Sequence, residues 1–128
     1  MIHDLRQLIN LISYFYNMNL KSIIDSKSNE FLALCKSHDV NTLYAFGSST
    51  NEKFNELYSD IDLLVELGTI DPIERGEKLM DLWEKFEGFF NRKVDLLTAS
   101  SIRNPFLRKS IDSSKILIYD GQKQEISF

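Results

Sequence analysis

The sequence predicts one α/β or α+β domain: a mixed sheet of about four strands flanked by helices. Three observations carry this prediction. Short apolar runs of strand length alternate with longer segments of helical periodicity. Turn and capping residues separate these runs, and 128 residues are enough for one hydrophobic core but not for two. Long helices between strands favour a layered fold of this kind.

The N-terminal segment has the spacing of a helix over residues 3–17, which we expect to end near Asn17–Asn19. We predict that residues 1–25 form a helical extension and that residues 26–128 form the main body of a single domain. The apolar face of this helix is broad enough to pack on the domain, on a second copy of the chain, or on a partner protein. The sequence leaves these alternatives open.

The later elements follow in order. Asp71 is a typical helix N-cap, and Pro72 suits the first helical position. Ser100 or Ser101 can cap a further helix that Pro105 enters. We expect a helix at 27–38 and another after Asp71, and strands at 40–46, 60–67, 94–97 and 115–119.

Composition limits the classes of function. The net charge of −4, from 15 basic and 19 acidic side chains, argues against direct nucleic-acid binding through a broad basic surface. A nucleotide substrate is still compatible, because a metal ion can supply positive charge locally. The single cysteine, Cys35, lies in an apolar run and is expected to be buried. No run has membrane-spanning length and no signal-peptide pattern is present, so a cytoplasmic protein is expected.

Three aspartates interrupt apolar strand segments. Asp60 and Asp62 are two residues apart, so their side chains project from one face of a strand. Two close carboxylates repel each other unless a cation lies between them. Asp95, in the next strand, would complete a cluster of three. Oxygen ligands alone favour Mg²⁺ or Mn²⁺ over zinc, and two such ions suit an in-line phosphoryl displacement.

A small-residue turn precedes this pair. Gly47 lets the backbone approach a phosphate closely, and the Ser48 hydroxyl adds a neutral donor. Each signal is weak when taken singly. The alternative interpretation is a solvated strand start at Asp60-Ile61-Asp62, and a salt bridge from Asp95 to Arg92 or Lys93. The order of the motifs favours the metal site.

Together, Gly47-Ser48, Asp60-Ile61-Asp62 and Asp95 resemble the signature of the minimal nucleotidyltransferases, which belong to the DNA polymerase β-like superfamily. The resemblance covers residues 28–119. It implies the polymerase β-like fold, two Mg²⁺ ions (or Mn²⁺), and transfer of a nucleoside monophosphate to an acceptor hydroxyl from ATP or another nucleoside triphosphate. The group includes antitoxins of HEPN-domain toxins, which implies a small helical HEPN-type partner protein.

Carried over by position, the resemblance assigns both catalysis and metal binding to Asp60, Asp62 and Asp95. It assigns the nucleotide phosphates to the turn of Gly47, Ser48 and Ser49. The chain departs from the family pattern in two ways. The segment from Ser49 to Ser59 is one residue longer than usual, and Ser49-Thr50 stands where many relatives have an arginine.

Three hypotheses about function follow. The preferred one is a Mg²⁺-dependent protein adenylyltransferase that acts as the antitoxin of a HEPN-type pair. The second is a non-catalytic antitoxin that acts by contact, with the N-terminal helix as a candidate surface for a partner or for homo-oligomerisation. The third is a small-molecule transferase of the aminoglycoside-modifying kind, for which a chain of this length would need a partner chain.

Overall fold

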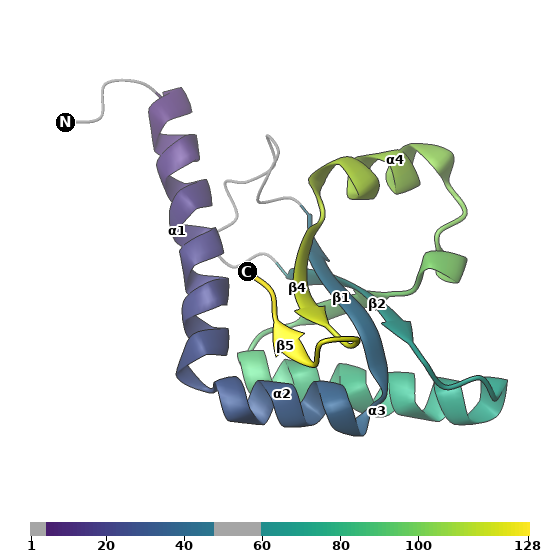
Figure 1. The fold of residues 1–128 in the computed structure, drawn as a ribbon. Coiled ribbons are helices and arrows are strands. Elements are labelled where there is room, and N and C mark those ends of the chain that lie inside the picture. Colours follow the sequence, from purple (N-terminus) through teal and green to yellow (C-terminus); the bar gives the residue numbers. More distant parts are fainter. Residues whose placement is uncertain (1–4, 48–59) are drawn as a thin grey trace.

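The computed structural model describes residues 5–47 and 60–128 (Figure 1), and the side chains of residues 9–19 are outside that description. The elements are α1 (Leu5–Ser26), α2 (Ser28–Ser37), β1 (Val40–Phe46), β2 (Ile61–Leu67), α3 (Pro72–Phe90), β3 (Val94–Leu97), the 3₁₀ turn η2 (Ala99–Ser101), α4 (Pro105–Ser114), β4 (Ile116–Asp120) and β5 (Glu125–Ile126). No helix among the described residues is both long and apolar enough to cross a bilayer.

The strands form one mixed sheet in the order β3-β2-β1-β4-β5. β2 and β3 are parallel and are joined through α3, whereas the other neighbouring pairs are antiparallel. The predicted mixed sheet is therefore confirmed. It has five strands rather than about four, because Glu125 and Ile126 fold back onto β4. Two residues are too few to show a strand periodicity in the sequence.

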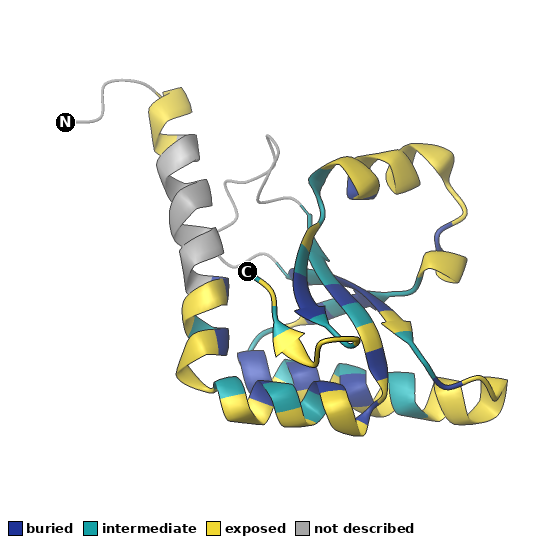
Figure 2. Cartoon of the chain, viewed as in Figure 1, coloured by how far each residue is buried: buried dark blue, intermediate teal, exposed yellow. Residues whose placement is uncertain are grey.

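One face of the sheet is covered by α2 and α3 (Figures 1 and 2). Phe31 of α2 lies among three aromatic rings of α3, at centroid distances of 5.9 Å to Phe86, 5.5 Å to Phe89 and 6.4 Å to Phe90. Cys35 is fully buried in the same core, as predicted. This layer holds most of the buried apolar side chains, and the helices pack there against one face of β2 and β3.

The opposite face carries a smaller cluster. Leu64, Ile102 and Ile111 are buried there, and three half-buried side chains pack against them: Tyr44, Phe46 and Leu97. Ile111 is the buried residue of α4, so this helix lies over the second face of the sheet. Among the described residues, this cluster is smaller than the core on the first face.

Two helix boundaries differ from the sequence prediction by more than two residues. α1 continues past Asn17–Asn19 to Ser26, because Leu20 and Ile24 extend its apolar stripe into the core and no proline or glycine interrupts it. The later helix is capped by the Asn104 side chain, which accepts from the Phe106 N–H at 2.9 Å. Pro105 therefore takes the first helical position, as it does in many helices. The predicted division at residue 25 stays a prediction.

The α3 helix begins as predicted. The Asp71 carboxylate accepts a hydrogen bond from the Glu74 N–H at 2.9 Å, and Pro72 follows the cap. From this helix, Trp83 donates its indole N–H to the Val94 carbonyl at 2.6 Å, and Glu87 accepts from the Val94 N–H at 3.0 Å. These side chains satisfy backbone groups on the outer edge of β3, the edge strand.

Candidate active site

The parallel pairing of β2 and β3 brings two of the predicted aspartates together. Asp62 and Asp95 are direct register partners, between the Ile61–Val94 and Leu63–Leu96 pairs. Neighbouring strands are about 4.8 Å apart. Residues at matching positions of parallel strands project from the same face, so both carboxylates emerge side by side.

Strand alternation identifies that face. Asp62 is two residues before Leu64, and Asp95 is two residues before Leu97. Both leucines belong to the small cluster beneath α4, so the carboxylates are on the α4 side of the sheet and are half-buried. Like charges on directly adjacent strands destabilise a sheet. A cation between Asp62 and Asp95 would offset this repulsion.

Gly47 closes the site on the β1 side. β1 is antiparallel to β2, and Phe46 is the register partner of Asp62. Gly47 has φ of +123°, a conformation that residues with a Cβ rarely adopt. A Cβ at Gly47 would overlap the Asp62 carboxylate and would lie 2.9 Å from its Cγ. The Asp62 carboxylate therefore occupies the position that a side chain at residue 47 would take.

Asp60 has a different environment. It precedes β2, and its Oδ2 atom lies 3.5 Å from the Lys93 ammonium. The Ile61 N–H also donates to the Lys93 carbonyl at 3.0 Å. Sequence reasoning placed Lys93 beside Asp95 as an alternative ion pair. The register explains the difference, because Lys93 precedes β3 just as Asp60 precedes β2.

The three-carboxylate cluster stays a prediction. Over residues 5–47 and 60–128, no three His, Cys, Asp or Glu side chains are grouped closely enough to hold a metal ion. Asp62 and Asp95 fit a shared oxygen-ligated cation by their register, and one oxygen of Asp60 lies 3.5 Å from the Lys93 ammonium. The other predicted nucleotide-binding residues, Ser48 and Ser49, lie outside the described residues.

A buried histidine lies on the helical side of the molecule. His38 is 7% exposed, and its side chain bridges α2 and α3. Its Nε2 is 2.6 Å from Asp81 Oδ2, and its Nδ1 is 2.8 Å from the Leu34 carbonyl oxygen. The hydrogen bond from His38 lowers the pKa of the Asp81 carboxyl. Through these two contacts His38 links the end of α2 to α3.

A pocket of about 490 Å³ opens at the other end of β2, between the start of α3 and η2. Its lining includes Glu66, Leu67, Arg75 and Thr98, but none of the three predicted aspartates. Arg75 donates to the Ile70 carbonyl at 3.2 Å, so its guanidinium already has a backbone partner. The paired carboxylates, rather than this pocket, carry the chemistry that the sequence predicts.

Comparison with known proteins identifies the class to which this fold belongs, a nucleotidyltransferase. The sequence model of the family described as "Polymerase beta, Nucleotidyltransferase" matches residues 29–124, which include β1 to β4. The chain therefore belongs to the polymerase β nucleotidyltransferase family. The predicted fold and enzyme class are confirmed.

Curated relatives agree with this assignment. A Methanocaldococcus jannaschii protein named "Putative protein adenylyltransferase" is 36% identical over 85 residues, covering 66% of this chain and 83% of the relative. Another protein of the same name and organism is 33% identical over 99 residues, covering 77% of this chain and 94% of the relative. The match thus extends over most of each relative's length.

Solved structures share the fold. A mutant of the toxin–antitoxin MntA–HpeT aligns with a TM-score of 0.51 and 20% identity, covering 74% of each chain. A toxin–antitoxin structure with AMP-PNP aligns with a TM-score of 0.50 and 23% identity, again covering 74% of each chain. At these identities the likeness concerns the fold alone.

Proposed function

We propose that this chain is a Mg²⁺-dependent protein adenylyltransferase that transfers AMP from ATP to a hydroxyl group of a HEPN-type partner protein, as the antitoxin of that pair. The observation that carries the proposal is the placement of Asp62 and Asp95 as register partners, with Gly47 against Asp62. The names of the curated relatives support protein adenylylation. The toxin–antitoxin origin of the fold neighbours supports the partner class.

The chemistry follows from the charge of the site. An oxygen of the acceptor hydroxyl forms a bond to the α-phosphorus of ATP, while the bond from that phosphorus to the pyrophosphate breaks and pyrophosphate leaves with the electron pair. Bound Mg²⁺ would neutralise the charge that develops on the phosphate oxygens. Asp62 and Asp95 are the residues that would hold it, because both offer half-buried carboxylate oxygens on one face.

Other residues of the chain have defined parts in the proposal. The missing side chain at Gly47 leaves space for the Asp62 carboxylate and for close approach of a phosphate to the backbone. We also assign the acceptor proton to Asp95, because one oxygen of a carboxylate can hold the metal ion while the other accepts a proton. Asp60 is held by Lys93 and would become a ligand once that ion pair opens.

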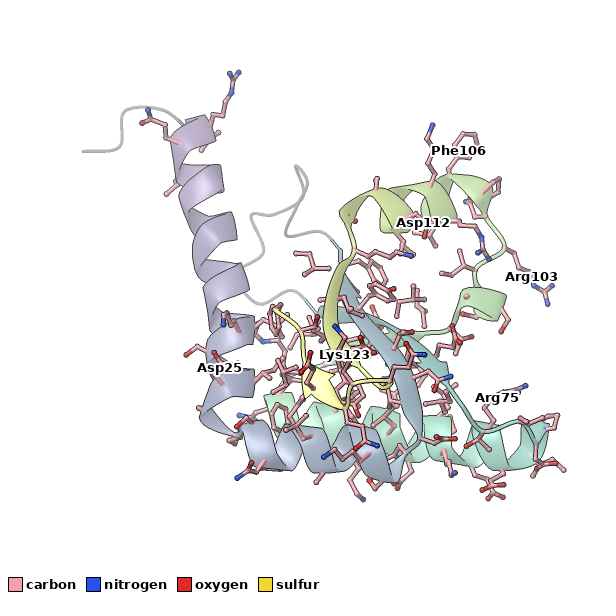
Figure 3. All side chains as sticks on the ribbon, in the orientation of Figure 1. Asp25, Arg75, Arg103, Phe106, Asp112 and Lys123 are labelled. Atoms are coloured by element: carbon pink, nitrogen blue, oxygen red, sulfur yellow. The ribbon has the colours of Figure 1, made fainter. Side chains whose placement is uncertain are left out.

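The test uses the purified chain, Mg²⁺, ATP labelled at the α-phosphate, and the HEPN-type protein that the proposal expects in a neighbouring reading frame. We expect label to enter the HEPN-type protein, and we expect Asp62→Asn to abolish transfer. Asp25→Asn is the matched control, since Asp25 is exposed on α1 and pairs only with Lys21 among the described residues (Figure 3). Absence of label with the wild-type chain would refute the proposal. So would full activity in Asp62→Asn.

A protection assay in cells distinguishes catalysis from neutralisation by contact. If the chain protects cells from the partner and Asp62→Asn protects equally well, contact rather than catalysis neutralises the toxin. The labelled-ATP assay and the protection assay therefore separate the adenylyltransferase from the contact antitoxin.

A further inference from the structure

The α4 helix keeps large apolar side chains in solvent. Phe106 is 83% exposed and Leu107 is 44% exposed, while Ile111 is the buried residue of the helix. Phe106 points away from the body of the protein in Figure 3. A phenylalanine that is this exposed buries little of its apolar surface within the described part of the chain. Exposed aromatic side chains of this kind are typical anchors of protein–protein contacts.

Basic side chains flank this phenylalanine. Lys109 is three residues after Phe106 and shares its helix face, whereas Ile111 is on the opposite face. Arg103 precedes the helix and extends outward (Figure 3). Among the described residues, neither Arg103 nor Lys109 takes part in an ion pair. We call Arg103, Phe106 and Lys109 the α4 surface.

The other charges of this helix have partners within the fold. Arg108 donates to the carbonyls of Ala99 and Ile102, at 2.8 and 3.0 Å, and so ties α4 to η2. Asp112, the single acidic residue of α4, pairs with Lys115 at 3.1 Å. The α4 surface is therefore locally positive on a chain whose net charge is −4.

The position of α4 connects this surface to the aspartate pair. Ile111 packs with Leu64 and against Leu97, which follow Asp62 and Asp95 by two residues in their strands. The inner side of α4 thus lies over the sheet face that carries the carboxylates. A protein seated on the outer side of α4 would lie beside that face.

We propose that the α4 surface docks an acidic segment of the acceptor protein, with an apolar side chain of that segment on Phe106 and its carboxylates at Arg103 and Lys109. This inference rests on the proposed function, because it needs a protein acceptor. Charge complementarity selects an acidic occupant. Nucleic acid fits less well, because two unpaired cations on an acidic chain give few phosphate contacts.

Binding of the HEPN-type protein to Asp62→Asn without ATP tests the docking. In that background we expect Phe106→Ala to weaken the affinity at least tenfold, the range of an interface anchor. Arg103→Glu/Lys109→Glu should weaken it further and reduce its salt dependence. Lys123→Glu, at the exposed turn before β5 (Figure 3), is the control and should bind normally. The exposure of Phe106 means that the fold should survive, which circular dichroism would verify.

Mg²⁺-ATP binding is measured in parallel on the same α4 substitutions made in the wild-type chain, where Asp62 is intact, and should be unchanged. Affinity for the HEPN-type protein within twofold of the parent value would overturn the docking. Loss of Mg²⁺-ATP binding in the same variants would also overturn it, by assigning α4 to the nucleotide. If the same variants weakened the binding of a labelled single-stranded RNA as much as they weakened the binding of the HEPN-type protein, the docking would also be overturned. A loss of self-association with no change in affinity for the HEPN-type protein would overturn it as well, because the occupant would then be a second copy of the chain.

The two proposals fail in different ways. If wild-type chain transfers AMP and the α4 variants transfer it with unchanged KM for the acceptor, the adenylyltransferase stands and the docking falls. If the α4 variants lose partner binding but no transfer occurs with wild type, the docking stands and the adenylyltransferase falls.

Discussion

The Gly47 backbone and the Asp62 side chain adjoin each other where β1 ends and β2 begins. The left-handed backbone of Gly47 directs the missing Cβ position into the Asp62 carboxylate, which occupies that position instead. The turn after β1 and the start of β2 are therefore mutually dependent. A side chain introduced at residue 47 should displace the Asp62 carboxylate.

Gly47→Ala should abolish AMP transfer while leaving a folded protein. The new methyl group displaces the Asp62 carboxylate, and the φ of +123° is strained for alanine. Backbone strain of this kind destabilises by about 1–3 kcal/mol, so urea unfolding should show a moderate loss. Gly76→Ala is the control: it lies within α3 with open space around it, and alanine should stabilise a helix there by about 1 kcal/mol. Wild-type transfer by Gly47→Ala would contradict the role of this contact.

Asp95→Asn should remove the response of the protein to Mg²⁺. Without metal, loss of one charge from the adjacent pair relieves repulsion, so the melting temperature should stay equal or rise slightly. With Mg²⁺, the wild-type chain should melt at higher temperature, because a ligand that binds only the folded state stabilises it. The variant should lose that increment. A Mg²⁺-induced shift equal to wild type in Asp95→Asn would exclude Asp95 as a ligand.

The contact between His38 and Asp81 should make stability depend on acid pH. Because His38 donates to Asp81, the carboxyl pKa is lower in the folded than in the unfolded chain. Its stabilisation is then complete above the ordinary pKa of 3.8 and is lost as pH falls through the lower folded-state value. Asp81→Asn should be less stable than wild type at pH 6, and the difference should vanish in strong acid. A gap that stays constant down to pH 2 would contradict this linkage.

Cys35 should be chemically silent in the native protein. Burial among apolar side chains raises the pKa of its thiol to about 12, so the reactive thiolate is scarce at neutral pH. We expect N-ethylmaleimide to modify the chain at pH 7.5 only when urea is added. Because Cys35 is the single cysteine, the readout by mass is unambiguous. Rapid modification without urea would show that the α2–α3 core opens readily.

Local patterns revealed most of the elements and the candidate residues. Asp60, Asp62 and Asp95 were visible because each interrupts an apolar strand, and Asp71-Pro72 marked the start of α3 from its capping chemistry alone. The pairing of Asp62 with Asp95 was a hypothesis until the parallel register of β2 and β3 was known. Sequence spacing does not state which strands are neighbours.

Long-range pairings account for what the sequence did not show. Lys93 reaches Asp60 rather than Asp95 because the strand register places both residues just before their strands. The α1 helix reaches Ser26 because Leu20 and Ile24 meet a core assembled from distant segments. These outcomes depend on tertiary packing, which overrides local propensity.

The most direct test of the central claim is mass spectrometry of the HEPN-type partner after incubation with the chain, Mg²⁺ and ATP. The account predicts that the partner gains AMP on a hydroxyl side chain, with one pyrophosphate released for each AMP, and that neither occurs with Asp62→Asn. An unmodified partner with the wild-type chain, or the same gain of mass with Asp62→Asn, would contradict the assignment of this site as an adenylyltransferase centre.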